Sequence, residues 1–177
     1  RDSPLSRGLG DVYKRQEYET AKQRGAQIYG EIISCHETSD GYSLVSPSGE
    51  GASRCMQGLE HLDKVDYINT HGTSTPAGDI TELKAIKEVF GDKMPPISST
   101  KSLTGHSLGA AGVHEVIYSL LMMKNNFLCG SHNIEEIDPE ARDFPILKEN
   151  EDTKINCFLS NSFGFGGTNG SIVIKKV

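Results

Sequence analysis

The sequence has no long apolar run. The longest candidate among its 177 residues extends from Val116 to Met123 and is interrupted by Tyr118 and Ser119. A membrane span needs roughly 20 apolar residues. The first residues also lack a charged segment followed by an apolar stretch, so we expect no secretory signal. These absences predict a protein that neither enters a membrane nor is exported.

Paired cysteine motifs are missing, and so is an excess of basic charge. None of the four cysteines (Cys35, Cys55, Cys129 and Cys157) belongs to a CxxC pair. Without an export signal, the economical interpretation is a reduced cytoplasmic protein. The chain has 18 lysines and arginines against 24 aspartates and glutamates, and its formal net charge of -6 argues against nucleic acid as a partner.

Glycine, by contrast, is abundant. It accounts for 19 of the 177 residues, against a usual share of about 7%. Much of it lies in the second half, beside histidine, threonine and serine. The length corresponds to about one domain at roughly 150 residues per domain, and could also be part of a larger protein.

Residues 1–16, RDSPLSRGLGDVYKRQ, differ in character from the rest and show little apolar periodicity. Asp11 to Gln16 is what the codons GAT GTG TAT AAG AGA CAG encode, which is the end of a transposase adapter used in sequencing libraries. We therefore interpret residues 1–16 as a non-native, adapter-derived segment and exclude them from the fold prediction. The alternative is a flexible natural amino terminus.

From residue 17 onward, apolar spacing predicts helices that alternate with strands. The predicted helices cover residues 17–25, 49–62, 79–90 and about 105–124. The predicted strands cover residues 26–34, 65–69, 97–100, 155–160 and 170–175. This alternation predicts an α/β fold with a largely parallel sheet.

Three polar segments that contain glycine each follow a predicted strand. They are residues 69–79 (NTHGTSTPAGD), 99–112 (STKSLTGHSLGAAG) and 160–170 (SNSFGFGGTNG). Ligands of open α/β sheets bind beyond the carboxyl ends of the strands. We therefore expect the three segments to converge on one site.

A hydrolase elbow is one alternative for the second segment. Residues 105–109 match G-x-S-x-G with Ser107 as nucleophile, but a polar spacer separates them from the preceding strand. The acid and the base would have to be Glu115 and His132, which leaves too little chain for the intervening elements. We therefore disfavour a hydrolase and interpret His114 and His132 as hydrogen-bonded structural residues.

Two other kinds of site are also poorly supported. A dinucleotide fingerprint fails because Asn169 stands where the third glycine belongs. A metal site fails because His71, His106 and His114 form no pair with ligand spacing. Cys35 and His36 cannot act together, because neighbouring residues of a strand point to opposite faces.

His71, Lys101 and His106 are the strongest candidates for chemistry. Each is expected in a loop bounded by glycine at a strand end, where a ligand can approach closely. We predict His106 at the amino terminus of the long helix, where the helix dipole disfavours the imidazolium form. A neutral imidazole there can donate a hydrogen bond at pH 7.

Together, HGTSTPAGD, TKSLTGHSLGAAG and NSFGFGGTNG closely resemble the carboxyl-terminal half of the β-ketoacyl-acyl-carrier-protein synthases. Residues 47–56 (PSGEGASRCM) and 112–123 resemble type I more than type II, although the closing GSIVIKK is closer to type II. The resemblance implies a thiolase-like fold, layered α/β/α/β/α in the complete enzyme. Residues 17–40 would then be the end of the amino-terminal half, and residues 41–177 the carboxyl-terminal half.

The family resemblance implies chain elongation in fatty acid biosynthesis by decarboxylative Claisen condensation. A cysteine thiolate takes an acyl chain from acyl carrier protein, malonyl-acyl carrier protein loses carbon dioxide, and the resulting carbanion attacks the acyl thioester. His71 and His106 match the two histidines that hold the malonyl thioester carbonyl and stabilise the enolate. Each such donor contributes about 3 kcal/mol to stabilisation of the transition state.

Further residues match family positions. Lys101 matches the lysine that organises the histidines, and Glu82 would be its acidic partner. Thr73 and Thr75 match hydroxyls that hold the phosphopantetheine arm. Phe165 matches the gating phenylalanine, whose N–H helps to form the acyl oxyanion hole, with Phe163 next to it. The positions at which some members hold a monovalent cation are Asn69, Glu115 and Ser160.

The sequence departs from the family in one respect, because none of its four cysteines has the setting of the nucleophile, a helix amino terminus after a strand. We therefore expect an acyltransferase fragment that is inactive alone. The complete enzyme would be a cytoplasmic homodimer that uses acyl carrier protein, without a tightly bound cofactor. The alternatives are a noncatalytic chain-length partner subunit, a polyketide-type ketosynthase and a decarboxylase.

Overall fold

The computed structural model describes residues 16–43 and 45–177 of the chain. Fifteen of the sixteen residues interpreted as adapter-derived, 1–15, lie outside this part. Five helices are present in it: α1 (Tyr18–Gln23), α2 (Glu50–Gln57), α3 (Gly78–Phe90), α4 (Lys101–Thr104) and α5 (Ala111–Asn125). None of these helices is long and apolar enough to cross a membrane.

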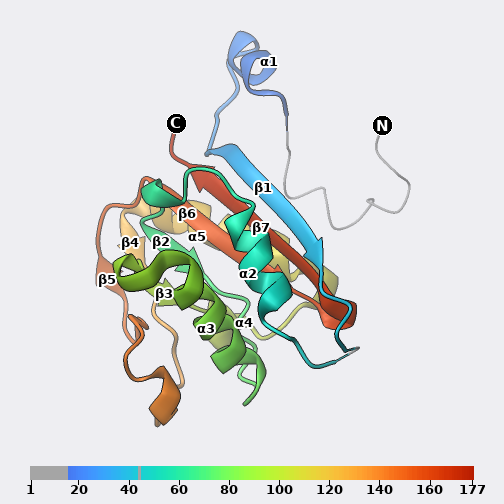
Figure 1. Cartoon of the computed structure of the whole chain (residues 1–177). Coiled ribbons are helices and arrows are strands. Elements are labelled where there is room, and N and C mark those ends of the chain that lie inside the picture. Colours follow the sequence, from blue (N-terminus) through green and yellow to red (C-terminus); the bar gives the residue numbers. More distant parts are fainter. Residues whose placement is uncertain (1–15, 44) are drawn as a thin grey trace.

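A sheet of five strands forms the centre of the molecule (Figure 1). Its order is β1 (Glu31–Ser39), β7 (Thr168–Lys175), β6 (Cys157–Phe163), β2 (Tyr67–Asn69) and β3 (Ile97–Ser98). A separate antiparallel pair joins β4 (Phe127–Leu128) to β5 (Glu151–Asp152). The strand β1 pairs with β7 along most of its length, so residues 31–39 share this sheet with the rest of the described chain.

The sheet is mixed, which corrects the expectation of a largely parallel one. β2 runs parallel to β3 and β6, whereas β7 is antiparallel to both β6 and β1. The cause is the connection between β6 and β7, which contains only a short 3-10 turn at Phe165–Gly167. A link this short can only form a hairpin, because a parallel crossover needs a dozen or more residues.

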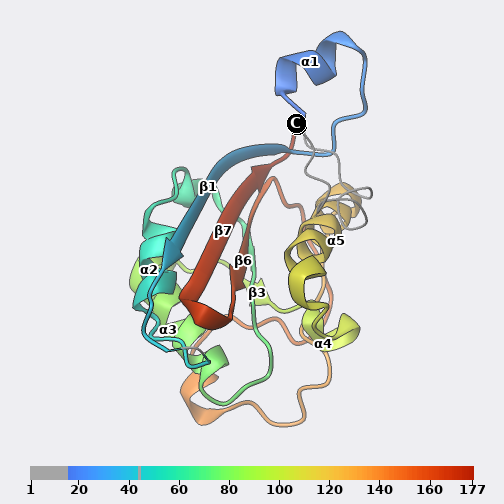
Figure 2. The same ribbon diagram turned by 90° about the vertical axis from the view of Figure 1, so that its right-hand side faces the viewer.

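Helices cover both faces of the sheet (Figure 2). On one face, α2 and α3 pack against a core that includes Met56, Leu83, Ile86 and Leu159. On the other face, α5 packs against a second core that includes Val116, Met122 and Phe158. Successive residues of a strand alternate between these two cores. Each strand therefore delivers side chains to both layers.

The predicted elements are present with shifted ends. The helix predicted at residues 79–90 forms at Gly78–Phe90 and ends before Gly91, whose φ of 60° suits glycine. The long helix begins later than predicted, at Ala111, because a 3-10 turn at Leu108–Ala110 precedes it. The first predicted strand also forms later than expected, as β1 at Glu31–Ser39.

Candidate active site

The polar segments after β2, β3 and β6 meet at one edge of the sheet. These three strands are parallel to one another, so their carboxyl ends lie together. The ring centroids of His71 and His106 are 5.3 Å apart, with the rings nearly perpendicular. The Phe163 ring lies 6.4 Å from that of His71. The structure thus brings together one residue from each of the three segments.

His71 is the more enclosed of the two histidines, whereas His106 is exposed. Burial lowers the pKa of His71 to about 3, and the positive charges of Lys101 and His106 act in the same direction. Its Nδ1 atom is buried and has no hydrogen-bond partner among the described residues. His71 is therefore a neutral imidazole at pH 7.

The expected position of His106 needs correction. It lies in the connection between α4 and the 3-10 turn at Leu108–Ala110, five residues before α5 begins. The dipole of the long helix therefore does not act on its ring directly, because this effect is confined to the first turn. Lys101 also lies elsewhere than expected, as the buried first residue of α4 rather than in a loop.

Lys101 forms a buried ion pair with Glu115 of α5, which corrects the expected pairing with Glu82. The reason is the layer from which each carboxylate comes. Glu115 belongs to α5, whereas Glu82 belongs to α3 on the opposite face of the sheet (Figure 2). Burial raises the pKa of Glu115, and the Lys101 ammonium opposes this shift.

Glu82 has a different task, which is to hold the backbone that carries His71. Its Oε1 and Oε2 accept hydrogen bonds from the N–H groups of His71 and Gly72, each at 2.9 Å. Burial raises the pKa of Glu82, while these two N–H donors favour the carboxylate form. From the other side, the Ser99 hydroxyl donates to the Gly72 carbonyl at 2.7 Å.

The threonine loop is held by an aspartate. Asp79 Oδ1 accepts from the N–H groups of Thr73 and Thr75 at 3.1 and 3.3 Å. The two threonine hydroxyl oxygens lie 3.2 Å apart. From the sequence, Asp79 is predicted only as the start of a helix, and its place at the end of HGTSTPAGD is the signal that it serves this loop.

Two of the three positions matched to a cation are neighbours in the sheet. Asn69 of β2 and Ser160 of β6 are register partners, and both are buried. Asn69 Nδ2 donates to Thr100 Oγ1 and to Ser119 Oγ of α5. Glu115 Oε2 is buried and has no hydrogen-bond partner among the described residues. This oxygen atom is a free acceptor of the kind that a cation needs.

Phe165 differs from Phe163 in its surroundings. Its side chain is 80% exposed on the 3-10 turn between β6 and β7. Gly166, the next residue, has a φ of 80°, which favours glycine in that turn. The structure records no contact between Phe165 and the two histidines.

The hydrolase alternative is not supported by the geometry. Glu115 pairs with Lys101, and His132 Nε2 lies 3.3 Å from Asn150 Oδ1. The Ser107 hydroxyl instead lies 2.9 Å from Nδ1 of His114, which is the hydrogen-bonded structural role expected for that histidine. Across residues 16–43 and 45–177, no cluster of three or more His, Cys, Asp or Glu side chains is arranged to hold a metal ion.

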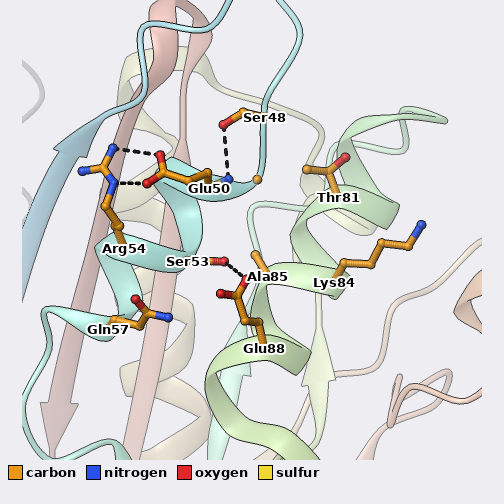
Figure 3. Close-up of a pocket in the computed structure, with 10 residues that line it drawn as sticks. Ser48, Glu50, Ser53, Arg54, Gln57, Thr81, Lys84, Ala85 and Glu88 are labelled. Carbon is orange, nitrogen blue, oxygen red and sulfur yellow. Dashed lines mark hydrogen bonds and ion pairs between the residues drawn. The ribbon is translucent and has the colours of Figure 1, made fainter.

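A cavity of about 450 Å³ lies between α2 and α3, away from the histidines (Figure 3). Its polar side chains are largely satisfied by one another. Glu50 binds Arg54 through both carboxylate oxygens, and the Ser53 hydroxyl donates to Glu88 at 2.7 Å. We therefore place the candidate site at the sheet edge rather than in this cavity.

Paired histidines lie within reach of the charge of a buried lysine at the edge of a five-stranded mixed sheet, and comparison with known proteins shows the family to which the chain belongs. Residues 29–135 match a family model described as the β-ketoacyl synthase carboxyl-terminal domain. Because this match covers more than half of the chain, the chain belongs to the β-ketoacyl synthase family.

The chain is similar to 3-oxoacyl-[acyl-carrier-protein] synthase 1 of Escherichia coli (strain K12). The two are 54% identical over 179 aligned residues, which cover 100% of this chain and 44% of that protein. The chain thus spans less than half the length of this relative. The greater likeness to type I expected from the sequence is confirmed.

Solved structures confirm the thiolase-like fold class. A β-ketoacyl synthase from Burkholderia phymatum has a TM-score of 0.86 and 38% identity, covering 92% of this chain and 41% of that one. A type II polyketide ketosynthase, solved in complex with its acyl-carrier protein, has a TM-score of 0.84 and 32% identity. This second match covers 92% of this chain and 42% of that one.

Proposed function

We propose that this chain is the carboxyl-terminal part of a β-ketoacyl-acyl-carrier-protein synthase that elongates acyl chains in fatty acid biosynthesis. The observation that carries the proposal is the 5.3 Å approach of the His71 and His106 rings at the edge where three loops meet. The full enzyme would join an acyl group to a two-carbon unit from malonyl-acyl carrier protein.

The two histidines suit the decarboxylation step of this reaction. When the malonyl carboxylate leaves as carbon dioxide, its bonding electrons pass into the thioester carbonyl and negative charge develops on that oxygen. Two imidazole N–H donors aimed at one oxygen stabilise this charge. His71 can donate without being charged, because burial keeps its pKa near 3. The enolate carbon then attacks the acyl thioester and expels the cysteine thiolate.

The remaining residues have supporting roles in this proposal. The charge of Lys101 acts on His71, and the ion pair with Glu115 leaves no buried ammonium unpaired. The Thr73 and Thr75 hydroxyls would bind the phosphopantetheine arm, which arrives on acyl carrier protein. Phe163 and Phe165 would contact the acyl chain, with Phe165 as a gate.

A monovalent cation fits the polar group formed by Asn69, Ser160 and Glu115. The unpartnered Glu115 Oε2 supports this site, since a buried carboxylate oxygen gains from a cation. Such an ion would hold the Glu115 carboxylate in place and, through it, the Lys101 ammonium. The proposal also includes a cytoplasmic homodimer as the complete form.

A noncatalytic chain-length subunit is less well supported. Such a partner has no need of two neighbouring histidines with a buried lysine, and this chain has all three. The residue at the nucleophile position distinguishes a catalytic synthase from a noncatalytic subunit. None of the described cysteines occupies that position, because none lies at a helix amino terminus after a strand.

The proposal is tested with a hybrid synthase. It joins residues 17–177 of this chain to the part of the Escherichia coli relative that precedes them in the alignment, and the unmodified relative serves as positive control. We expect the hybrid to form β-ketoacyl-acyl carrier protein from acyl and malonyl carrier proteins. A folded hybrid that takes up an acyl group on its cysteine and yet neither decarboxylates nor condenses malonyl-acyl carrier protein would contradict the proposal.

A further inference from the structure

Asn161 is a fully buried amide that no part of the reaction described above uses. It lies in β6, directly opposite Ser171 of β7 in the strand register. The Ser171 hydroxyl donates to Asn161 Oδ1 at 2.8 Å. Both side chains are buried, so water does not compete for this hydrogen bond.

The two partners of Asn161 together fix which way its amide points. The ionised Glu82 carboxylate only accepts, so Nδ2 faces Glu82, and the Ser171 hydroxyl, which can donate or accept, then donates to Oδ1. Nδ2 donates to Glu82 Oε1 at 3.3 Å and lies 3.5 Å from Met56 Sδ. A flipped amide would instead turn its oxygen toward the Glu82 carboxylate, which only accepts when ionised.

Glu82 in turn holds the loop that carries His71. Its two oxygens bind the N–H groups of His71 and Gly72, one each. The hydrogen bond from Asn161 reaches Oε1, the oxygen that also serves His71. A continuous chain of hydrogen bonds therefore runs from Ser171 in the sheet through Asn161 and Glu82 to the backbone of His71.

We propose that Asn161 and Ser171 are positioning residues for His71. Ser171 holds the side chain of Asn161 in place, the amide of Asn161 holds the rotation of the Glu82 carboxylate, and the carboxylate fixes the loop on which the imidazole stands. Neither residue touches substrate. This inference rests on the proposed function, because it assigns the two residues to the histidine that serves decarboxylation.

The other hydrogen bonds at this loop show why the carboxylate needs a third donor. Ser99 holds the Gly72 carbonyl, but only Glu82 is recorded as binding the two N–H groups. Glu82 lies on the opposite face of the sheet from the ion pair of Lys101 and Glu115 and makes no ion pair itself among the described residues. Its orientation therefore depends on neutral donors, of which Asn161 is the one supplied by a side chain.

The test measures two half-reactions of the hybrid synthase, which are acylation of the cysteine and decarboxylation of malonyl-acyl carrier protein. Ser171→Ala removes the hydroxyl, and Ser171→Thr restores one. Ser53→Ala is the matched control, because it deletes a buried hydroxyl with a similar hydrogen bond, at 2.7 Å to Glu88, away from the histidines. Melting temperatures are recorded for all three.

We expect Ser171→Ala to lower kcat for decarboxylation roughly tenfold, the effect of losing one buried hydrogen bond. KM for malonyl-acyl carrier protein and the rate of acylation should stay at the level of the parent hybrid. Ser171→Thr should recover most of the rate. Ser53→Ala should keep both rates while losing a similar amount of thermal stability.

Asn161→Asp tests the hydrogen bond to Glu82 with almost no change in side-chain volume. It replaces the Nδ2 donor by a carboxyl oxygen, so the hydrogen bond to Glu82 Oε1 is lost. Decarboxylation by this variant should therefore fall at least as far as in Ser171→Ala, while acylation of the cysteine stays at the level of the parent hybrid.

The outcomes separate this inference from the proposed function. If the parent hybrid acylates its cysteine but does not decarboxylate malonyl-acyl carrier protein, the proposed function is wrong. If the parent is active and Ser171→Ala and Asn161→Asp both decarboxylate at the parental rate, the positioning role is overturned. Equal loss of acylation and decarboxylation would also overturn it, since that result indicates only a damaged fold.

Discussion

Lys101 and Glu115 pair in the layer between the sheet and α5, with side chains that are 5% and 2% exposed. A buried charge that loses its partner is costly, whereas a pair removed as a whole costs much less. Lys101→Met should therefore lower the free energy of unfolding by about 3–5 kcal/mol, and Lys101→Met with Glu115→Leu should recover most of this loss. Urea denaturation of the hybrid synthase measures both.

The loss of stability caused by Lys101→Met should depend on pH. Burial raises the pKa of Glu115 above that of the unfolded chain, and Lys101 opposes this shift. Without Lys101 the folded state holds the proton of Glu115 more tightly. The destabilisation by Lys101→Met should then be small near pH 5 and grow as the pH rises toward 8. A loss that is equal at both pH values would show that Glu115 does not sense Lys101.

His71 should remain neutral far below the usual pKa of histidine. With histidine labelled at Cε1, the His71 signal, assigned by its absence in His71→Asn, should not titrate between pH 8 and about 5. Because the folded pKa lies below the unfolded one, protonation favours unfolding, so His71 weakens stability as the pH falls below about 6.5. Titration with a midpoint near that of free histidine would refute the burial argument.

The cysteines of this chain should not accept acyl groups. Burial raises the pKa of Cys55, Cys129 and Cys157, that of Cys157 to about 11, so little thiolate forms at pH 7. Cys35 is exposed on β1, in the middle of a strand. The purified chain, incubated with radiolabelled acyl thioester, should incorporate no label at these four positions. The acylated cysteine of the hybrid synthase is the positive control.

The segments that form the site are predicted from the sequence better than the contacts between their side chains are. The helix at 79–90 and the loops that carry His71 and His106 follow from local apolar spacing and from glycine, which are properties of short segments. The partner of Lys101 depends on which face of the sheet each helix covers, whereas the expected partner, Glu82, rests on the family resemblance alone. The roles of Asp79 and Asn161 were missed because each acts only through a backbone or side chain brought near by folding.

The direction of β7 is likewise not predicted by local sequence patterns. Its apolar pattern is equally consistent with a parallel or an antiparallel strand, and only the short link from Phe163 to Thr168 distinguishes them. The segment 160–170 is predicted as a ligand loop, and its polar residues do not indicate that it also closes a hairpin.

The central claim is that His71 and His106 together serve decarboxylation rather than acylation. It is tested most directly by measuring the two half-reactions separately in the hybrid synthase and in its His71→Ala and His106→Ala variants. We predict that each variant loses malonyl decarboxylation by at least about a hundredfold, the effect of one oxyanion donor, while cysteine acylation stays largely intact. Equal loss of both half-reactions in either variant would contradict this account.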